Sequence, residues 1–395
     1  MEISLKRIAS IDVFRALTML LMIFVNDFWT LTGIPDWLQH SEAHIDFLGF
    51  SDTIFPCFLF IVGMSVPFAI KARIAKGENN FQIIKHIVLR SVALLVMGLF
   101  TVNIPEMYEA ATGIHKAVFQ ISAVVAFFLI WNVYPKSEGS KKYISLILQL
   151  AGVSILLFLA YRFRGGDGGE KAEVMKTHWW GILGLIGWTY LTCAILYLFF
   201  HKANSILIAC WVFFTFICIA GHAGWLHRLW PSGPNDWILG NGAFSSFTFA
   251  GILATLLLER FYTTSHKTKL VYIYLAIGIL MLGLGLFMRN FFIISKIYAT
   301  PTWVFLCSGI AFITYAIIYW LVDLQHKAHW FYIIKPAGTS TLTCYLIPYI
   351  IYFVPLSLPV SLTFGIVGLF KSLLFSLLVI GITALLGKIG IKLKI

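Results

Sequence analysis

The chain contains 395 residues, of which 59% are hydrophobic and only 12% are charged, and its mean hydropathy is +0.88. Soluble globular proteins carry about 25% charged residues, so this composition excludes a soluble domain and indicates a protein whose solvent is largely lipid. The formal net charge is +12. Because the basic residues form neither a soluble basic domain nor a stripe interleaved with aromatic residues, no nucleic-acid partner is expected.

Apolar runs long enough to cross a bilayer, which needs about 20 residues per helix, recur along the whole chain. They lie at residues 11–31, 53–71, 86–103, 116–134, 143–161, 179–200, 204–222, 243–259, 270–290, 302–322, 338–354 and 361–387. Pro355 and Pro359 separate the last two runs, which alternatively form one broken helix. The sequence therefore predicts an all-α, polytopic integral membrane protein with 11–12 transmembrane helices, in which residues 1–395 form a single domain.

The distribution of Lys and Arg predicts the orientation of the helices. The N-terminus leads into the first run without a small-residue cleavage site, so a removable signal peptide is not expected. With a cytoplasmic N-terminus in an inner membrane, the inner connections carry more than twice as many basic residues as the outer ones, as the positive-inside rule requires. This orientation exposes the longest connections to the periplasm: 32–52, 104–115, 161–178, 223–242 and 291–301.

Polar side chains in the first run are notable because charged and amide groups are costly at membrane depth. Asp12 and Arg15 lie three residues apart near the inner end of this run, a spacing that favours an interfacial ion pair on one helix face. Asn26 and Asp27 lie near its outer end. For Asn26, a hydrogen bond to a neighbouring helix and a catalytic role are both open.

The connection after the first run, residues 35–46, places two histidines among three carboxylates beside Trp37. An imidazole exchanges protons near neutral pH, and a neighbouring carboxylate can fix its tautomer, so His40 and His44 are candidate general bases. Each taken alone could also be a solvated surface histidine. Imidazole and carboxylate groups bind zinc, but their spacing matches no zinc motif and no metal is expected. Asp52 or Ser51 is a natural N-cap for the second helix, and capping alone would explain Asp52.

As a set, these residues resemble the family of heparan-alpha-glucosaminide N-acetyltransferase, a transmembrane acyltransferase group. The resemblance is carried by Ser-Ile-Asp-Val-Phe-Arg at 10–15, Phe-Val-Asn at 24–26, the histidine loop, and the segment from Ser51 to Gly63. Residues 178–188 and 335–342 are similar to a bacterial branch of the group. The resemblance implies that the single domain is acyltransferase-like.

In that family an acetyl group passes from cytosolic acetyl-CoA to an amino sugar on the far side of the membrane. The resemblance therefore implies a transmembrane acetyltransferase acting on an amino sugar or glycan at the periplasmic face. It implies that Asn26 matches the family's asparagine, His40 its catalytic histidine, and Asp52 its aspartate before the Phe-Pro pair. The histidine loop is a few residues longer here, so His44 remains a competing base.

Further site predictions concern the two substrates. Basic residues at the inner face are predicted to hold the anionic end of acetyl-CoA, although the positive-inside rule also explains their charge: Arg15, Lys71, Arg73 and Arg260. Outer residues, mainly amphipathic aromatics, are predicted to contact the sugar: Trp37, Asp27, His178 and Trp179. The lipid bilayer is an expected partner, and the sequence is compatible with either a monomer or a homodimer.

The chemistry of acyl transfer assigns roles to these side chains. His40 is interpreted as base or acetyl carrier, Asn26 as oxyanion donor or substrate orienter, and Asp52 as the group that orients the imidazole. Ala16 replaces the family's usual glycine, and its Asp-Pro-Glu-Gly motif is not recognisable, which leaves the acceptor open. The alternatives are a sugar or lipid transporter or flippase, and an O-acyltransferase of a surface polysaccharide.

Overall fold

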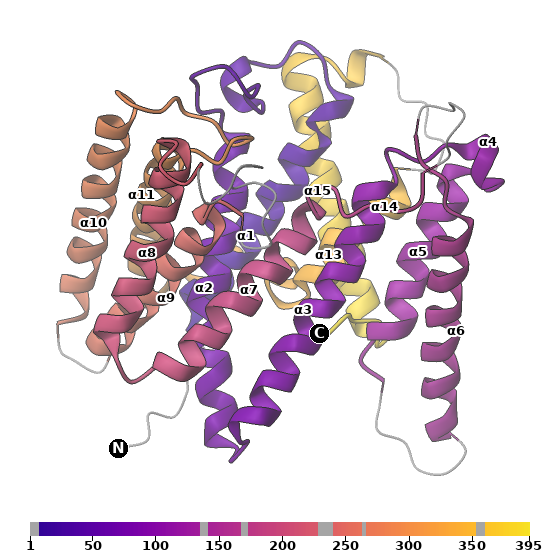
Figure 1. The fold of residues 1–395 in the computed structure, drawn as a ribbon, viewed down its shortest axis with the longest axis horizontal. Helices are drawn as coiled ribbons and strands as arrows, with labels where there is room; N and C mark the ends of the chain where they lie inside the picture. The colour runs from indigo at the N-terminus through magenta and orange to yellow at the C-terminus, as the bar shows by residue number, and fades with distance from the viewer. Residues whose placement is uncertain (1–7, 135–140, 167–172, 228–239, 263–265, 353–359) are drawn as a thin grey trace. The chain divides into compact units, whose positions relative to one another are not determined.

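The computed structural model describes residues 8–134, 141–166, 173–227, 240–262, 266–352 and 360–395. Within these ranges the regular structure is helical, and extended pairing is limited to isolated bridges. In the described part of the chain, ten helices are long and apolar enough to cross a membrane. Figure 1 shows the path of the chain through these helices. The prediction of an all-α, multi-pass membrane protein is therefore confirmed.

The long helices follow the predicted apolar runs closely. They are α1 (Ala9–Asn26), α2 (Ser51–Ala75), α3 (Asn80–Asn103), α6 (Lys141–Arg162), α7 (Gly181–Phe200), α8 (Asn204–His222), α9 (Ala243–Tyr262), α10 (Lys267–Met288), α11 (Pro301–Tyr319) and α15 (Gly365–Lys388). Short helices connect or interrupt them: α4 (Glu109–Thr112), α5 (Lys116–Trp131), α12 (Lys335–Thr339), α13 (Thr341–Leu346) and α14 (Pro348–Ile351).

Two of the twelve predicted runs form shorter apolar helices than expected. The run 116–134 gives α5, which has 16 residues, and the run 338–354 is divided between α12, α13 and α14. Pro348 lies at the division between α13 and α14, where its missing amide hydrogen cannot continue the helical hydrogen bonds. Pro355 and Pro359, on which the alternative of one broken helix depended, lie outside the described residues.

The chain divides into two compact units. Unit 1 comprises Met1–Val88, Trp188–Gly338 and Pro359–Ser376, and unit 2 comprises Leu89–Gly187, Thr339–Leu358 and Leu377–Ile395. Unit 1 contains α1, α2 and α8 to α11, and within it α10 packs along α11 and α2 along α9. The predicted histidine loop and its carboxylates belong to this unit.

Glycines allow α2 and α9 to approach closely. A Cβ atom added to Gly63 would lie 1.9 Å from the Thr248 carbonyl oxygen, and one added to Gly251 would lie 1.9 Å from the Phe60 carbonyl oxygen. Small residues at a helix contact let the backbones meet, which is how membrane helices gain packing contacts without a hydrophobic driving force. The middle of α2 is therefore held closely against α9.

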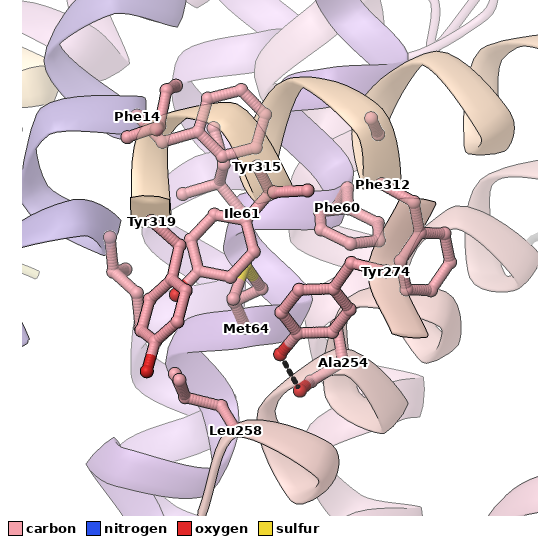
Figure 2. Packing of buried hydrophobic residues seen from close by; sticks show 14 of the residues in the cluster. Phe14, Phe60, Ile61, Met64, Ala254, Leu258, Tyr274, Phe312, Tyr315 and Tyr319 are labelled. Atoms are coloured by element: carbon pink, nitrogen blue, oxygen red, sulfur yellow. Dashed lines mark hydrogen bonds between the residues drawn. The ribbon is translucent and has the colours of Figure 1, made fainter. Parts of the chain in front are cut away.

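An aromatic cluster joins α1, α2, α10 and α11 (Figure 2). The rings of Phe14 and Tyr315 stack with centroids 5.9 Å apart, and Phe60 meets Phe312 edge to face at 4.9 Å. The hydroxyl of buried Tyr274 donates a hydrogen bond to a backbone carbonyl of α9 at 2.7 Å, shown as the dashed line in Figure 2. Because aromatic pairs add packing energy beyond area burial, this cluster stabilises the frame that carries the candidate site.

Unit 2 is organised around α5 and α6, which pack against each other. The ring of Phe119 on α5 contacts Phe100 of α3 and Phe163 after α6, with centroids 6.5 and 5.9 Å apart. The Gln120 side chain donates a hydrogen bond to the Tyr349 carbonyl at 2.6 Å. This bond ties the short helix α14 to α5.

Candidate active site

The histidine loop joins η1 (Asp27–Thr30) to α2 and is closed at its base. The hydroxyl of Ser51 donates to the Leu38 carbonyl at 2.5 Å. A Cβ atom at Gly49 would lie 1.9 Å from the Gln39 carbonyl oxygen, so this close approach of two backbone segments requires glycine. The chain before His40 and the start of α2 are thereby held together.

His40 and Asp52 form the closest polar pair of the candidate site. His40 Nδ1 lies 2.8 Å from Asp52 Oδ1, and Asp52 is 1% exposed whereas His40 is 44% exposed. The other oxygen, Oδ2, accepts backbone N–H bonds from Ser41 at 3.0 Å and Gly49 at 3.2 Å. The carboxylate thus holds Nδ1, while Nε2 has no partner among the described residues.

The N-cap interpretation of Asp52 is wrong. Helix α2 begins at Ser51 with Phe50 as its cap residue, and no side chain caps it. Asp52 lies in the first turn, and its carboxylate turns back toward the loop, where it meets two backbone N–H groups and one imidazole. Its own carbonyl accepts the indole N–H of buried Trp303 at 3.1 Å, which ties this turn to α11.

Lys296, in the segment between α10 and α11, completes this group. Its Nζ lies 3.1 Å from His40 Nδ1 and 3.8 Å from Asp52 Oδ1, and its side chain is 29% exposed. Burial lowers the pKa of Lys296 from its ordinary value, although the negative charge of Asp52 acts in the opposite direction. Sequence reasoning missed this lysine because no motif marks it.

Several hydrogen bonds dock the histidine loop onto the segment that carries Lys296. Asp46 forms an ion pair with Arg289 at 2.8 Å and accepts the Ile294 amide at 2.7 Å. The hydroxyl of Ser295 donates to the Ala43 carbonyl at 2.8 Å. Partial burial acts to raise the pKa of Asp46, but the Ile294 hydrogen bond and the Arg289 charge outweigh it, so this pKa is lowered.

The segment 295–300 is itself held in a strained conformation. Ala299 has φ of +49°, which is costly for a residue with a Cβ atom. The Tyr298 carbonyl accepts from His222 Nε2 at 3.0 Å and Asn241 Nδ2 at 3.2 Å, and the Ala299 carbonyl accepts from Asn241 Nδ2 at 3.0 Å. The Cys218 thiol also donates to Ala299 at 3.4 Å.

His44 has a different environment from His40. The Tyr298 hydroxyl lies 3.1 Å from His44 Nδ1 and 3.0 Å from Nε2, and the two rings meet edge to face. His44 is therefore positioned by a phenol rather than a carboxylate. A cavity of about 460 Å³ adjoins the same tyrosine and is lined by Gly221, His222, Phe291, Phe292, Ile293, Tyr298 and Thr300.

The two polar residues at the end of α1 differ in burial. Asn26 is exposed at the end of α1, and its side chain makes no hydrogen bond with any residue that the structure describes. Asp27 is buried, and its Oδ2 accepts from Lys371 at 2.7 Å and Ser372 at 2.5 Å. Lys371 also donates to Thr30 at 2.6 Å. Contact of Asp27 with an acceptor sugar stays a prediction and would require this ion pair to open.

The other residues predicted to contact the sugar are exposed. Trp37, in unit 1, is 58% exposed, and Trp179, in unit 2, is 57% exposed. His178, also in unit 2, is exposed and has φ of +43°. Their exposure leaves these side chains available to a ligand, and their binding roles stay predictions.

The predicted ion pair in α1 is confirmed. Arg15 binds Asp12 at 3.1 Å, and it also donates to the Ser65 hydroxyl at 2.7 Å and the Gly338 carbonyl at 3.4 Å. These bonds join α1 to α2 and α12. An anion that bound Arg15 would compete with these partners.

The remaining basic residues predicted to bind acetyl-CoA fall into two groups. Lys71 pairs with Glu259 at 2.5 Å, and Arg73 pairs with Glu78 at 2.7 Å. Arg260, by contrast, lines a cavity of about 590 Å³, whose other walls are formed by Asn204, Ile208, Trp211, Ala250, Leu253, Leu256, Leu257, Ile277, Met281 and Phe312. No group of three or more His, Cys, Asp or Glu residues in the described ranges is arranged to hold a metal.

Comparison with known proteins gives a family. A family model described as Domain of unknown function (DUF5009) matches residues 7–259, more than half of the chain. Heparan-alpha-glucosaminide N-acetyltransferase of Homo sapiens is 31% identical over 97 residues, and that of Mus musculus is 33% identical over 101. Each match covers 25% of this chain but only 14% of the relative. The chain belongs to the DUF5009 family, and its resemblance to these acetyltransferases is confirmed over a quarter of its length.

Proposed function

We propose that this protein is a transmembrane acetyltransferase that moves an acetyl group from cytosolic acetyl-CoA to an amino sugar or glycan on the periplasmic side of the inner membrane. The observation that carries the proposal is the hydrogen bond between the buried Asp52 carboxylate and His40 Nδ1. This bond leaves the other ring nitrogen, Nε2, available to accept a proton. A histidine oriented by a carboxylate is the usual arrangement of a general base or nucleophile in acyl transfer. The printed names of the relatives support the same reaction class.

In the proposed reaction, His40 Nε2 takes a proton from the acceptor amine as the amine nitrogen attacks the thioester carbonyl. The new N–C bond forms, the C–S bond breaks, and the proton passes from His40 to the departing CoA thiolate. Asp52 stabilises the imidazolium that exists between these two proton transfers. Asn26, exposed at the end of α1, is proposed as a donor to the oxyanion of the tetrahedral intermediate.

The donor side of the proposal is supported by the cavity at Arg260. A guanidinium group suits a phosphate, and the predominantly apolar walls of this cavity suit the extended arm of an acyl-CoA. Lys71 and Arg73 are paired with glutamates, so Arg260 is the best placed of the four predicted residues. The proposed orientation, with a cytoplasmic N-terminus, puts Arg260 on the acetyl-CoA side and His40 on the acceptor side.

Proteoliposomes test both the reaction and its direction. Acetyl-CoA labelled in the acetyl group is enclosed in the vesicles, and glucosamine is added outside. The proposal predicts labelled N-acetylglucosamine outside and one free CoA thiol inside for each product molecule. Movement of unmodified glucosamine into the vesicles without consumption of acetyl-CoA would instead support a transporter, and label recovered in ester linkage would support an O-acyltransferase.

A further inference from the structure

Lys296 reaches the candidate site from a segment distant in sequence and approaches the same imidazole nitrogen as Asp52. Its Nζ lies 3.1 Å from His40 Nδ1, and Asp52 Oδ1 lies 2.8 Å from that atom. We propose that Lys296 is a positioning residue whose positive charge keeps His40 neutral, with its proton on Nδ1 and a free electron pair on Nε2. This inference rests on the proposed function of His40 and adds a device that sets its protonation state.

The short contact between His40 Nδ1 and the Asp52 carboxylate favours a proton on Nδ1. Asp52 Oδ2 accepts hydrogen bonds from the amides of Ser41 and Gly49, and Oδ1 accepts a hydrogen bond from the Nδ1–H group of His40. A neutral imidazole has one N–H, and an Nδ1 that donates to Asp52 cannot also accept from Lys296. Lys296 therefore acts on His40 through its charge rather than through a hydrogen bond.

The charges of Asp52 and Lys296 have opposite effects on His40. The Asp52 carboxylate alone stabilises the imidazolium, which is neither a base nor a nucleophile. An ammonium group 3.1 Å from the ring destabilises that same form, because like charges at short range repel. With both present, the carboxylate orients the ring while the ammonium group opposes a positive charge on it.

Other titratable groups around His40 do not substitute for Lys296. In the histidine loop, Asp46 is neutralised by Arg289, Glu42 is exposed, and His44 contacts Tyr298. From α11, the Cys307 thiol lies 3.9 Å from the Asp52 carbonyl. Among the described residues, Lys296 is thus the cation placed directly at the His40–Asp52 pair.

The backbone around Lys296 is fixed by contacts on both sides of it. Ser295 is bonded to the histidine loop through Ala43, and the carbonyls of Tyr298 and Ala299 are held by His222 and Asn241. A strained backbone that is held by several side chains often occurs at functional sites. The position of the lysine is therefore set by the fold and not by the lysine alone.

The reactivity of each histidine toward diethylpyrocarbonate tests this proposal without an acceptor substrate. The reagent acylates the neutral imidazole, and peptide mass spectrometry gives the modification rate of His40 as a function of pH. The full-length protein is measured in lipid nanodiscs as wild type, Lys296→Met, Lys296→Gln and Lys296→Arg. His44 in each sample is a matched internal control, because it is held by Tyr298 and not by the Asp52 pair.

The proposal predicts that the midpoint of the His40 profile rises by about one pH unit or more in Lys296→Met and Lys296→Gln. Lys296→Arg should keep the wild-type midpoint, and the His44 profile should not move in any variant. A His40 midpoint that stays in place or falls in both neutral variants would overturn the proposal, as would an equal shift of His44. Loss of acetyl transfer in His40→Ala is measured separately, so failure of the proposed function is distinguishable from failure of this inference.

Discussion

His40 Nδ1 lies 2.8 Å from the Oδ1 atom of Asp52, whose carboxylate is 1% exposed. Two backbone amides bind the second oxygen of this carboxylate, so its direction is set before any substrate arrives. Preorganised groups of this kind need no rearrangement during the reaction. The pair accordingly makes the start of α2 part of the proposed chemistry.

Asp52→Asn should reduce acetyl transfer by about 10²- to 10⁴-fold. The amide has nearly the shape of the carboxylate, but it cannot stabilise the imidazolium, and its NH₂ group favours the wrong tautomer of His40. The rate is measured with saturating acetyl-CoA and glucosamine. An Asn variant that transfers acetyl groups within twofold of wild type would contradict the orienting role of Asp52.

Lys296→Met should leave the melting temperature unchanged or raise it, although it alters the reactivity of His40. The pKa of Lys296 is lowered by burial, so the charged form is less favourable in the folded protein than in the unfolded chain. Lys296 therefore releases its proton more readily in the folded protein than in the unfolded chain. As a result, the free energy of unfolding rises as pH increases toward 10.5, the ordinary pKa of a lysine. Thermal unfolding at pH 7 and pH 9.5 measures this effect, and a clear fall in melting temperature at pH 7 would indicate a structural role instead.

Asp46→Asn should loosen the contact between the histidine loop and the segment after α10. The pKa of Asp46 is lowered from its ordinary value of 3.8, so its contribution to stability is fully present above that value and is lost as pH falls through the lowered pKa. Hydrogen exchange of the peptide containing Ile294 should be faster in the variant at pH 7. The difference between variant and wild type should disappear once both are acidified below the pKa of Asp46, and its persistence there would contradict the ionic explanation.

The buried ion pair between Asp27 and Lys371 should show strong coupling. Removal of one partner leaves a buried charge without compensation, which costs about 3–5 kcal/mol. Asp27→Asn and Lys371→Met should each destabilise the protein, and the double variant should lose less than the sum of the two effects. Equilibrium unfolding in a lipid or detergent phase gives these energies.

Asn26→Ala is the matched control for these variants. Asn26 adjoins Asp27, but its side chain is exposed and has no hydrogen-bond partner among the described residues. Its stability should change by less than about 0.5 kcal/mol. Strict additivity of the Asp27 and Lys371 variants would show that the two side chains do not interact in the membrane.

The sequence predicted the helices well because lipid allows a spanning segment few alternatives to a helix. It predicted the break near residue 350 less well, since the division at Pro348 lies inside a run that contains no charged residue. The pairing of His40 with Asp52 was predictable, because only a short connection separates them and the resemblance supplies both residues. The N-cap interpretation failed because the loop offered the Asp52 carboxylate better donors than the helix terminus did.

The contribution of Lys296 could not be predicted, because 256 positions separate it from His40 and a single lysine in a loop has no distinguishing pattern. The same holds for His222 and Asn241, which act on backbone carbonyls that a sequence does not display. From the sequence, Lys371 is visible only as a charged residue within the predicted run 361–387. Its partner Asp27 lies 344 positions away, and tertiary packing alone brings them together.

The most direct test of the central claim compares the acetyl transfer rates of His40→Ala and His44→Ala, prepared and reconstituted in the same way. Both histidines lie in one loop, but only His40 is bonded to Asp52. If His40 is the base or acetyl carrier, its replacement should lower the rate by about 10²-fold or more, while His44→Ala should retain most of the activity. A folded His40→Ala protein that releases CoA and acetylates the acceptor at the wild-type rate would contradict the claim.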